Sequence, residues 1–428
     1  MKITLKTEKY KILKLFLVSY LLLSYAYFKI ISTFWYWNKI AILKNEKFSF
    51  DFGRYLVVSI AIILCVFTIC YINQKKFIFS IQAIVLLLFV IPSGITFSSY
   101  KIIEPSVFIG HLLFLVTLIL FSRIKIIIPI KKLTIKHSYH SLFILALIGM
   151  IPFLKYWYLV NLNNLLLIDI YKTRDLFSNV GNLYTAYTYS WFSIIIIPAL
   201  IVFSIFYKNR IVLLLSIAML IFLFLFGAQK SVFFGLTIVL IFYYKDYLQK
   251  IKYVLVGTLS IVVLGIISSL LLNSDLILIY TIRRVFMLPS LLDFVYFDFF
   301  NENYLYWSEV VGDIFKTYPY SENHSRIIGE VYFNSSEISA NNGIISDGYM
   351  NFGMLGVFLN ILVVSAFYSA INHLNISNKF FGLYFLFTIA ILSSSLSTVL
   401  LTHGGIILLF ISIIFLKDSK FVMENYKI

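Results

Sequence analysis

Residues 253–273 read YVLVGTLSIVVLGIISSLLLN, a run without a charged side chain. At a rise of about 1.5 Å per residue, a helix of this length reaches about 30 Å, the thickness of the hydrocarbon core of a bilayer. Similar runs recur along the chain, in which 61% of the residues are hydrophobic and 13% are charged. Soluble domains have about 45–50% apolar and about 25% charged residues. The sequence therefore predicts an integral membrane protein.

Working outward from this run, windows of about 20 apolar residues predict an all-α polytopic membrane protein with about 12 transmembrane helices. The predicted spans are 12–34, 55–72, 77–98, 106–122, 141–160, 187–207, 211–227, 231–244, 253–273, 350–371, 380–400 and 404–416. Pro92, Pro152 and Pro198 fall inside spans and are expected to kink them. The sequence contains no internal repeat, so residues 1–428 are predicted to form a single integral membrane domain.

The positions of Lys and Arg predict the orientation, because the cytoplasmic connections of membrane proteins collect basic residues. With the N-terminus inside, the cytoplasmic connections hold more Lys and Arg than the outer ones, although the outer ones are longer in total. Both termini are thus predicted to be cytoplasmic, and the longest connection, 274–349, to be one large extracytoplasmic loop. The net charge of +16 then reflects this topology, and nucleic acid is not expected as a partner.

The outer connections carry basic residues that the orientation does not require. Residues 280–298 are too polar to span a membrane and too apolar to stay in water, so they are predicted to form an amphipathic segment in the outer interface. A guanidinium binds phosphate oxygens through two parallel hydrogen bonds. The alternative to phosphate binding, for each basic residue, is an exposed side chain that is only solvated by water. The candidate ligands of a phosphate group are Arg174, Lys230, Arg283, Arg284 and Arg326.

Three titratable side chains near the end of the long loop, His324, Glu330 and Asp347, are candidates for a general base. Two of them have structural alternatives. Glu330 has the spacing of a helical ion pair with Arg326, and an Asp directly before Gly348 is typical of a turn.

Metal and nucleotide chemistry lack a supporting motif. His324 and His403 are the two histidines predicted to face outward, and Glu46 and Asp51 in the first outer connection are not a D-x-D pair. The sequence contains no phosphate-binding loop, no G-x-G-x-x-G after a strand and no G-x-S-x-G. We therefore expect no metal site and no cofactor.

Several stretches resemble the Wzy-type oligosaccharide repeat-unit polymerases, which make O-antigen and capsular polysaccharide. The resemblance covers about residues 170–360. It rests on RRVFMLP at 283–289 followed by YFDFF at 296–300, on ANNGIISDGYMNFGMLG at 340–356, on GAQKS at 227–231 and on TRD at 173–175.

The resemblance implies a bacterial inner-membrane enzyme similar in fold to the GT-C glycosyltransferases. Its substrate would be an undecaprenyl-diphosphate-linked oligosaccharide at the outer face of the membrane, and a chain-length regulator and a flippase of the same pathway would be partners. An incoming hydroxyl would attack the sugar carbon bound to diphosphate. Arg174, Arg283, Arg284, Arg326 and Lys230 would bind the diphosphate and sugar, and Glu330, Asp347 or His324 would take the proton.

Two other functions fit parts of the pattern. An O-antigen ligase or another lipid-linked glycosyltransferase would share the large outer loop and its arginines. A polysaccharide flippase would suit twelve spans, but transporters usually bury charges near the middle of the membrane. Here the charges that stand out lie in outer loops, which favours the polymerase.

The first prediction concerns topology. A reporter fused at Ser335 is expected to be extracytoplasmic and one fused at Lys132 cytoplasmic, because basic residues stay inside. Paired alkaline phosphatase and green fluorescent protein fusions measure this. Both reporters on one side, or a reversed result, would refute the orientation.

Overall fold

The computed structural model describes residues 2–34, 48–71, 76–101, 103–124, 138–312, 314, 316–374 and 376–416. Every regular element in these ranges is a helix, which confirms the predicted all-α polytopic membrane protein. The expectations for Glu46 and for the reporter site at Lys132 fall outside the described residues.

Nine helices of the described residues are long and apolar enough to cross a membrane. They are Tyr10–Thr33, Phe52–Tyr71, Phe77–Phe97, Tyr139–Leu159, Leu183–Phe206, Arg210–Gly227, Tyr247–Leu272, Ile344–His373 and Leu396–Ile414. Two shorter apolar helices, Ser106–Phe121 and Lys230–Ile241, coincide with the predicted fourth and eighth spans.

The predicted span 380–400 is wrong as a continuous helix. Helix α17 (Phe381–Ala390) ends ten residues before that boundary, and α18 (Leu396–Leu400) starts after a non-helical break. Ten residues rise about 15 Å, half of the hydrocarbon thickness. In the break, the Ile391 carbonyl accepts a hydrogen bond from the Ile344 N–H at 3.2 Å, so a tertiary contact satisfies the interrupted backbone.

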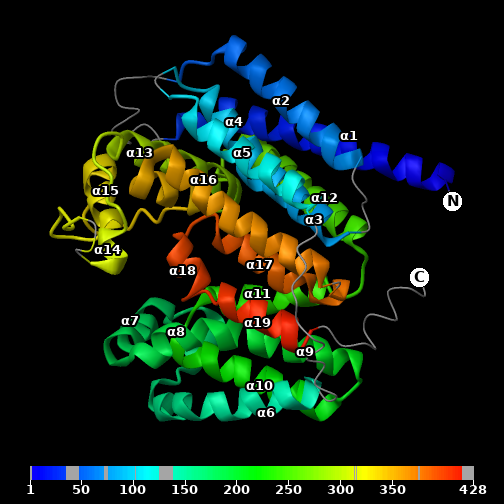
Figure 1. The fold of residues 1–428 in the computed structure, drawn as a ribbon, viewed down its shortest axis with the longest axis vertical. Helices are drawn as coiled ribbons and strands as arrows, with labels where there is room; N and C mark the ends of the chain where they lie inside the picture. The colour runs from blue at the N-terminus through cyan, green and yellow to red at the C-terminus, as the bar shows by residue number, and fades with distance from the viewer. Residues whose placement is uncertain are drawn as a thin grey trace. The chain divides into compact units, whose positions relative to one another are not determined.

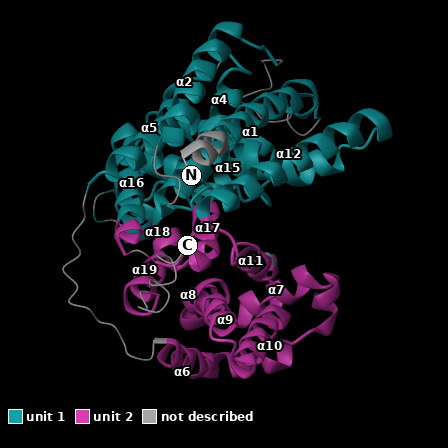
Figure 2. Ribbon diagram, turned by 90° about the vertical axis from the view of Figure 1, so that its right-hand side faces the viewer, with its two compact units in different colours: residues 1–124, 247–369, 391–396 teal, residues 125–246, 370–390, 397–428 magenta. Residues whose placement is uncertain are grey.

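The chain folds into two compact units (Figure 2). The first contains residues 1–124, 247–369 and 391–396, and the second contains 125–246, 370–390 and 397–428. Each unit therefore combines segments that are distant in the sequence.

The first unit is built around long apolar helices, of which α1 and α12 lie side by side (Figure 1). Residues of the long loop 274–349 supply four of its elements, η8, α13, α14 and α15, so this loop is folded. The elements are α1 (Lys2–Lys29), η1 (Ile31–Thr33), α2 (Phe52–Tyr71), α3 (Phe77–Val85), η4 (Leu86–Val90), α4 (Ile91–Phe97), α5 (Ser106–Phe121), α12 (Tyr247–Leu272), η8 (Leu278–Met287), α13 (Leu288–Phe299), α14 (Ser308–Val311), α15 (His324–Phe333) and most of α16 (Ile344–His373).

The second unit contains the remaining apolar helices, and α10 packs along α9 within it. Its elements are α6 (Ser138–Met150), η5 (Ile151–Leu159), η6 (Leu162–Leu166), α7 (Ile170–Val180), α8 (Leu183–Ser190), η7 (Trp191–Ile196), α9 (Ile197–Phe206), α10 (Arg210–Gly227), α11 (Lys230–Ile241), η9 (Asn378–Phe380), α17, most of α18, and α19 (Gly405–Ile414).

Prolines distort the helices at the expected places. Pro92 and Pro198 each stand in the first turn of an α-helix that continues a π-helical stretch, η4 or η7, and Pro152 opens the 3-10 stretch η5. Proline has no N–H to donate and its ring clashes with the carbonyl four residues earlier, so a regular α-helix cannot continue through it.

The predicted interfacial segment 280–298 divides into two different parts. Helix η8 buries one side, including Ile282 and Phe286, and exposes Tyr280 and Arg284, as an amphipathic helix does. Helix α13 is instead buried at every position from Ser290 to Phe297, so the interfacial interpretation is wrong for this half. It packs against α4, α5 and α15 because its side chains are apolar on all sides.

Helix α16 is interrupted by a reversal of the backbone near its start. Phe352 and Gly353 have non-helical dihedral angles, and Gly353 has φ 61° and ψ −148°. The turns before and after the break meet at Gly348 and Gly356, where a Cβ on Gly356 would lie 2.0 Å from the Gly348 carbonyl oxygen. Glycines at these positions therefore allow residues 344–351 to pack against the beginning of the longer part of α16.

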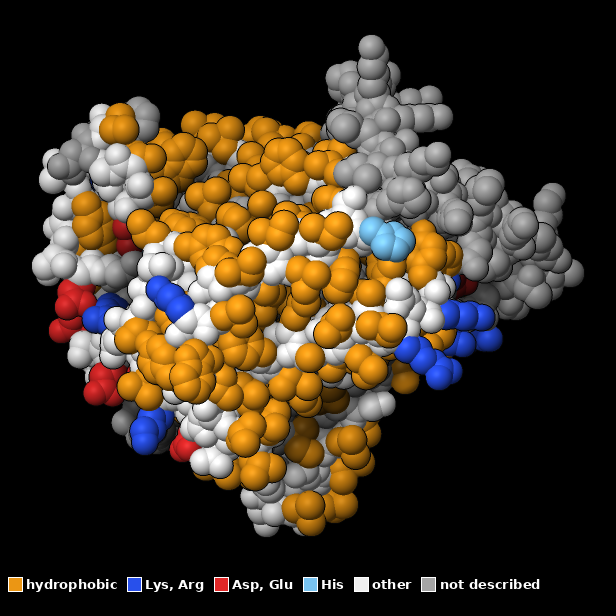
Figure 3. Space-filling model, turned by 90° about the horizontal axis from the view of Figure 1, so that it is seen from below, with side chains coloured by type: hydrophobic (Ala, Val, Ile, Leu, Met, Phe, Trp, Pro, Cys, Tyr) orange, Lys and Arg blue, Asp and Glu red, His pale blue; other side chains and the backbone are white. Residues whose placement is uncertain are grey.

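Apolar side chains cover most of the described surface in Figure 3, and charged side chains gather near its edges. A broad apolar belt between charged margins is what lipid contact requires. The arrangement agrees with an integral membrane protein.

The second prediction tests the reversal in α16. Gly353→Ala is expected to destabilise the protein by about 1–3 kcal/mol, because these dihedral angles are nearly restricted to glycine. Its Cβ would also lie 2.8 Å from the Tyr304 hydroxyl oxygen. Thermal unfolding of the purified protein measures the change. Gly257→Ala is the control, since no heavy atom lies within 4 Å of that Cβ, and equal stability of both variants would contradict the interpretation.

Candidate functional site

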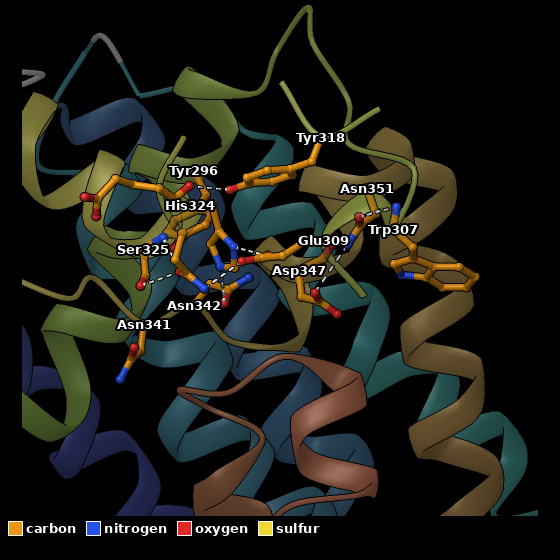
Figure 4. Close-up of polar contacts among 12 residues, drawn as sticks. Tyr296, Trp307, Glu309, Tyr318, His324, Ser325, Asn341, Asn342, Asp347 and Asn351 are labelled. Atoms are coloured by element: carbon orange, nitrogen blue, oxygen red, sulfur yellow. Dashed lines mark hydrogen bonds and ion pairs between the residues drawn. The ribbon is translucent and has the colours of Figure 1, made fainter. Parts of the chain in front are cut away.

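A buried histidine and a glutamate meet at the start of α15, in the folded segment 274–349 (Figure 4). His324 Nδ1 is hydrogen-bonded to Glu309 Oε2. Asn323, the N-cap of α15, donates from Nδ2 to Glu309 Oε1 at 2.6 Å and accepts from the Ser325 N–H. Glu309 thus receives a donor on each carboxylate oxygen, which fixes its orientation toward the imidazole.

The opposite nitrogen of His324 faces an amide. Nε2 lies 3.4 Å from Asn342 Oδ1, while Asn342 Nδ2 is buried without a hydrogen-bond partner among the described residues. When the Nδ1–H of a neutral imidazole donates to Glu309, the lone pair is on Nε2. If the side-chain amide of Asn342 rotates by 180°, its Nδ2–H can donate to that lone pair. The Nε2 side of His324 is therefore weakly held and able to accept another donor.

Two tyrosines line this pair and remain protonated. The Tyr296 ring packs edge-on to the imidazole at 5.8 Å, and its hydroxyl donates to the Ala340 carbonyl at 2.7 Å. Burial, with the nearby carboxylate of Glu309, raises the pKa of Tyr296 well above its usual value. Burial and Glu309 also raise the pKa of Tyr318. Both phenols are hydrogen-bond donors here and not bases.

Asp347 lies close to this pair, but its carboxylate is fully engaged (Figure 4). Oδ2 accepts from Asn360 Nδ2 and from the Leu396 N–H, each at 3.0 Å, and Oδ1 accepts from Asn351 Nδ2 at 3.3 Å. The carboxylate therefore joins the two parts of α16 to the first residue of α18. These bonds support a structural role for Asp347, different from both the base and the simple turn considered from the sequence.

Glu330 is exposed near the end of α15. The sequence allowed a helical ion pair between Glu330 and Arg326. In the structure, Arg326 Nη1 instead contacts Glu322 Oε2 at 3.5 Å. Both groups of that pair are well exposed, so it contributes little to stability.

The paired arginines of η8 differ from one another. Arg283 is half-buried and its Nε reaches the Ile279 carbonyl at 3.5 Å, whereas Arg284 is exposed. Arg283, Arg284 and Arg326 all belong to the first unit, with His324 and Glu309. Among these arginines, Arg284 and Arg326 are the exposed ones.

The second unit holds the other two basic candidates. The Arg174 guanidinium and the Lys230 ammonium lie over the ring of Tyr171, 5.6 and 5.1 Å from its centroid. Lys230 is also the first residue of α11, where the helix dipole favours negative charge. Two cations at a helix N-terminus form a local positive site that an anion can occupy.

A buried ionisable pair, which the sequence did not predict, connects α5 to α13. His111 Nε2 lies 2.9 Å from Asp293 Oδ2, and the side chains are 1% and 4% exposed. His111 Nδ1 and Asp293 Oδ1 are buried without a partner among the described residues. Tyr296 is one turn beyond Asp293 on α13, so this pair helps to set the position of the tyrosine that packs on His324.

Glu309 and Asn342 were also missed, since neither has a sequence pattern of its own. Fifteen positions separate Glu309 from His324, and the fold alone brings them together. No group of three or more His, Cys, Asp or Glu in the described ranges is arranged to hold a metal ion.

The third prediction concerns the pair between α5 and α13. Asp293→Asn or His111→Ala is expected to destabilise the protein by about 3–5 kcal/mol, because either change leaves the partner buried and uncompensated. The double variant His111→Leu/Asp293→Leu should recover part of this loss, since no polar group is then left unpaired. Denaturant unfolding measures all three. Additive losses in the double variant would show that the two side chains do not depend on one another.

Comparison with protein-family models, with curated proteins and with solved structures found no match to this chain.

Proposed function

We propose that this protein is a membrane glycosyltransferase that joins lipid-diphosphate-linked oligosaccharide repeat units into a surface polysaccharide. The observation that carries the proposal is the Glu309–His324 pair, an oriented base in the folded loop between two apolar spans. The resemblance to the repeat-unit polymerases supplies the substrate, undecaprenyl-diphosphate-linked oligosaccharide, and the bacterial inner membrane as the location.

In the proposed reaction, the hydroxyl of the incoming unit replaces Asn342 beside His324 Nε2. Its oxygen forms a bond to C1 of the growing chain as its proton moves to Nε2. The bond between C1 and the diphosphate oxygen breaks, and undecaprenyl diphosphate leaves with the electron pair. Glu309 holds the imidazole and stabilises its positive charge, and general base catalysis of this kind contributes about 10²–10⁴-fold.

The leaving diphosphate needs positive charge, which the exposed Arg284 and Arg326 of the first unit supply in this proposal. A preorganised donor to a developing anion contributes about 2–4 kcal/mol. Arg283 of the first unit stays a candidate for diphosphate or sugar binding, and Arg174 and Lys230 stay separate candidates for the same role in the second unit. The substrate brings its own activated bond, so no nucleotide sugar is consumed.

A flippase for the same lipid-linked substrate is a second candidate, favoured by the buried His111–Asp293 pair. Ionisable groups inside membrane proteins often carry protons for transport. A polymerase extends chains in detergent solution, where no membrane separates two sides, and a flippase does not.

The fourth prediction tests the base. Purified protein, given lipid-linked repeat units in detergent with excess EDTA and no nucleotide sugar, is expected to extend chains. His324→Gln should lower the rate about 10²–10⁴-fold, and Glu309→Gln should lower it less, because the imidazole remains. Gel separation of labelled products measures the rate.

Glu337→Gln is the matched control for Glu309→Gln, since Glu337 is an exposed glutamate of the same loop. Wild-type extension by His324→Gln would remove this residue from the mechanism. Activity that is lost in EDTA and restored by Mg²⁺ or Mn²⁺ would reject the metal-free reaction.

A further inference from the structure

The short segment around α14 exposes apolar side chains next to the Glu309–His324 pair. We call Tyr306–Val311 the α14 segment. Val310 is 58% exposed and Val311 40%, and the rings of Tyr306 and Trp307 are also partly exposed. These neighbouring side chains form a small apolar surface that water solvates poorly.

Glu309 lies inside this apolar sequence but points the other way. It binds His324 and Asn323 on α15, while Val310 and Val311 remain exposed. The α14 segment thus has two sides, one apolar and exposed, the other carrying the carboxylate that orients the imidazole. Any contact that holds the apolar side also holds Glu309.

Backbone bonds tie the segment to the reversal in α16. The Tyr306 N–H donates to the Asn351 carbonyl at 3.2 Å, and the Trp307 N–H donates to Asn351 Oδ1 at 2.8 Å. Both rings pack edge-on against Phe352, at 5.4 and 5.0 Å. Figure 4 shows Trp307 on the outer side of Asn351, away from His324.

The longer part of α16, just after this reversal, belongs to a candidate membrane span. Its exposed residues Leu355, Phe358 and Leu359 are apolar, as expected of a helix side that faces lipid. Phe352, three residues before Leu355, contacts both rings of the segment, so the partly exposed aromatic rings continue from this helix side. This continuity points to the bilayer as the occupant.

Two consecutive residues of the segment have an unusual backbone. Tyr306 and Trp307 have φ of 52° and 59°, values that bulky residues rarely adopt. These angles place two neighbouring rings against Phe352, as an interfacial aromatic anchor requires. Tyr and Trp prefer the boundary of a membrane, because their rings are apolar and their O–H and N–H groups bind water or headgroups.

We propose that the α14 segment inserts its apolar side into the boundary of the bilayer, and that this lipid contact holds Glu309 against His324. The partner is a lipid surface. The effect on catalysis rests on the proposed function, whereas the lipid contact does not. The active histidine is then fully oriented only at the membrane surface, where a lipid-linked substrate arrives.

The first measurement locates the segment directly. The full-length protein carries a nitroxide on Val310→Cys in a Cys65→Ala/Cys70→Ala background and is placed in phosphatidylethanolamine–phosphatidylglycerol vesicles. Oxygen, which concentrates in lipid, should relax this label more than a water-soluble nickel complex does. A label on Glu337→Cys, an exposed polar position of the same loop, should show the reverse. A label at 310 with the relaxation of the one at 337 would overturn the proposal.

The second measurement tests the coupling to Glu309. Val310→Asp is expected to lower chain extension in vesicles at least about fivefold, because a carboxylate at the membrane boundary is unfavourable. Val310→Leu should retain the rate. Ser336→Asp is the matched control, since it adds a carboxylate at an exposed polar position of the same loop, and it should change the rate less than twofold. Equal rates for Val310→Asp and Ser336→Asp would refute the coupling.

These outcomes separate the two proposals. Lipid relaxation at position 310 in a protein that never extends chains would keep the anchor and reject the polymerase. Chain extension with a water-exposed label would do the opposite. Dipolar coupling between labels at 310 of two molecules would mean that a second copy of the chain covers this surface, and would also overturn the lipid contact.

Discussion

The arrangement of the candidate site depends on one buried carboxylate, that of Asp347, which requires hydrogen-bond donors. Asp347 is inside an apolar unit, where an unpaired charge is very costly. It gathers Asn351, Asn360 and the Leu396 N–H, and so fixes the reversal in α16 and the start of α18. Asn351 in turn holds the backbone before α14. The position of Glu309 thus depends on a network that does not touch the imidazole.

The second constraint on the site comes from α13. This helix is buried on all sides, so its position is set by packing and by two polar contacts, Asp293 with His111 and Tyr296 with the Ala340 carbonyl. Tyr296 then packs against His324. The imidazole is held from one side by a carboxylate and from another by an aromatic ring, and its Nε2 edge faces Asn342, which the proposed substrate hydroxyl would replace. Such support by neighbouring groups is what a general base would need for efficient proton transfer.

The reaction proposed here takes place at a boundary. The donor is dissolved in lipid through its prenyl chain, while the sugars and the attacking hydroxyl are in water. A base on a folded loop with an apolar edge, such as the α14 segment, satisfies both conditions. Two exposed arginines of the first unit, Arg284 and Arg326, lie in this loop, where the proposed reaction would need positive charge.

The sequence alone determined the class of fold. Apolar runs of membrane length leave few alternatives to helices, because backbone groups in lipid must be satisfied within the segment. The boundaries of most spans and the distortions at Pro92 and Pro198 were predicted for the same local reasons. His324 was also predicted as a candidate base, from its place in the outer loop.

Only the tertiary structure decided which side chains meet. The sequence allowed a continuous span at 380–400, and the fold breaks it because the Ile344 N–H and Asp347 bind the freed backbone. Likewise, no periodic pattern or sequence motif marks Glu309, Asn342 or the His111–Asp293 pair. Their roles arise from contacts between residues distant in sequence, while periodicity and composition report only local preferences and lipid solubility.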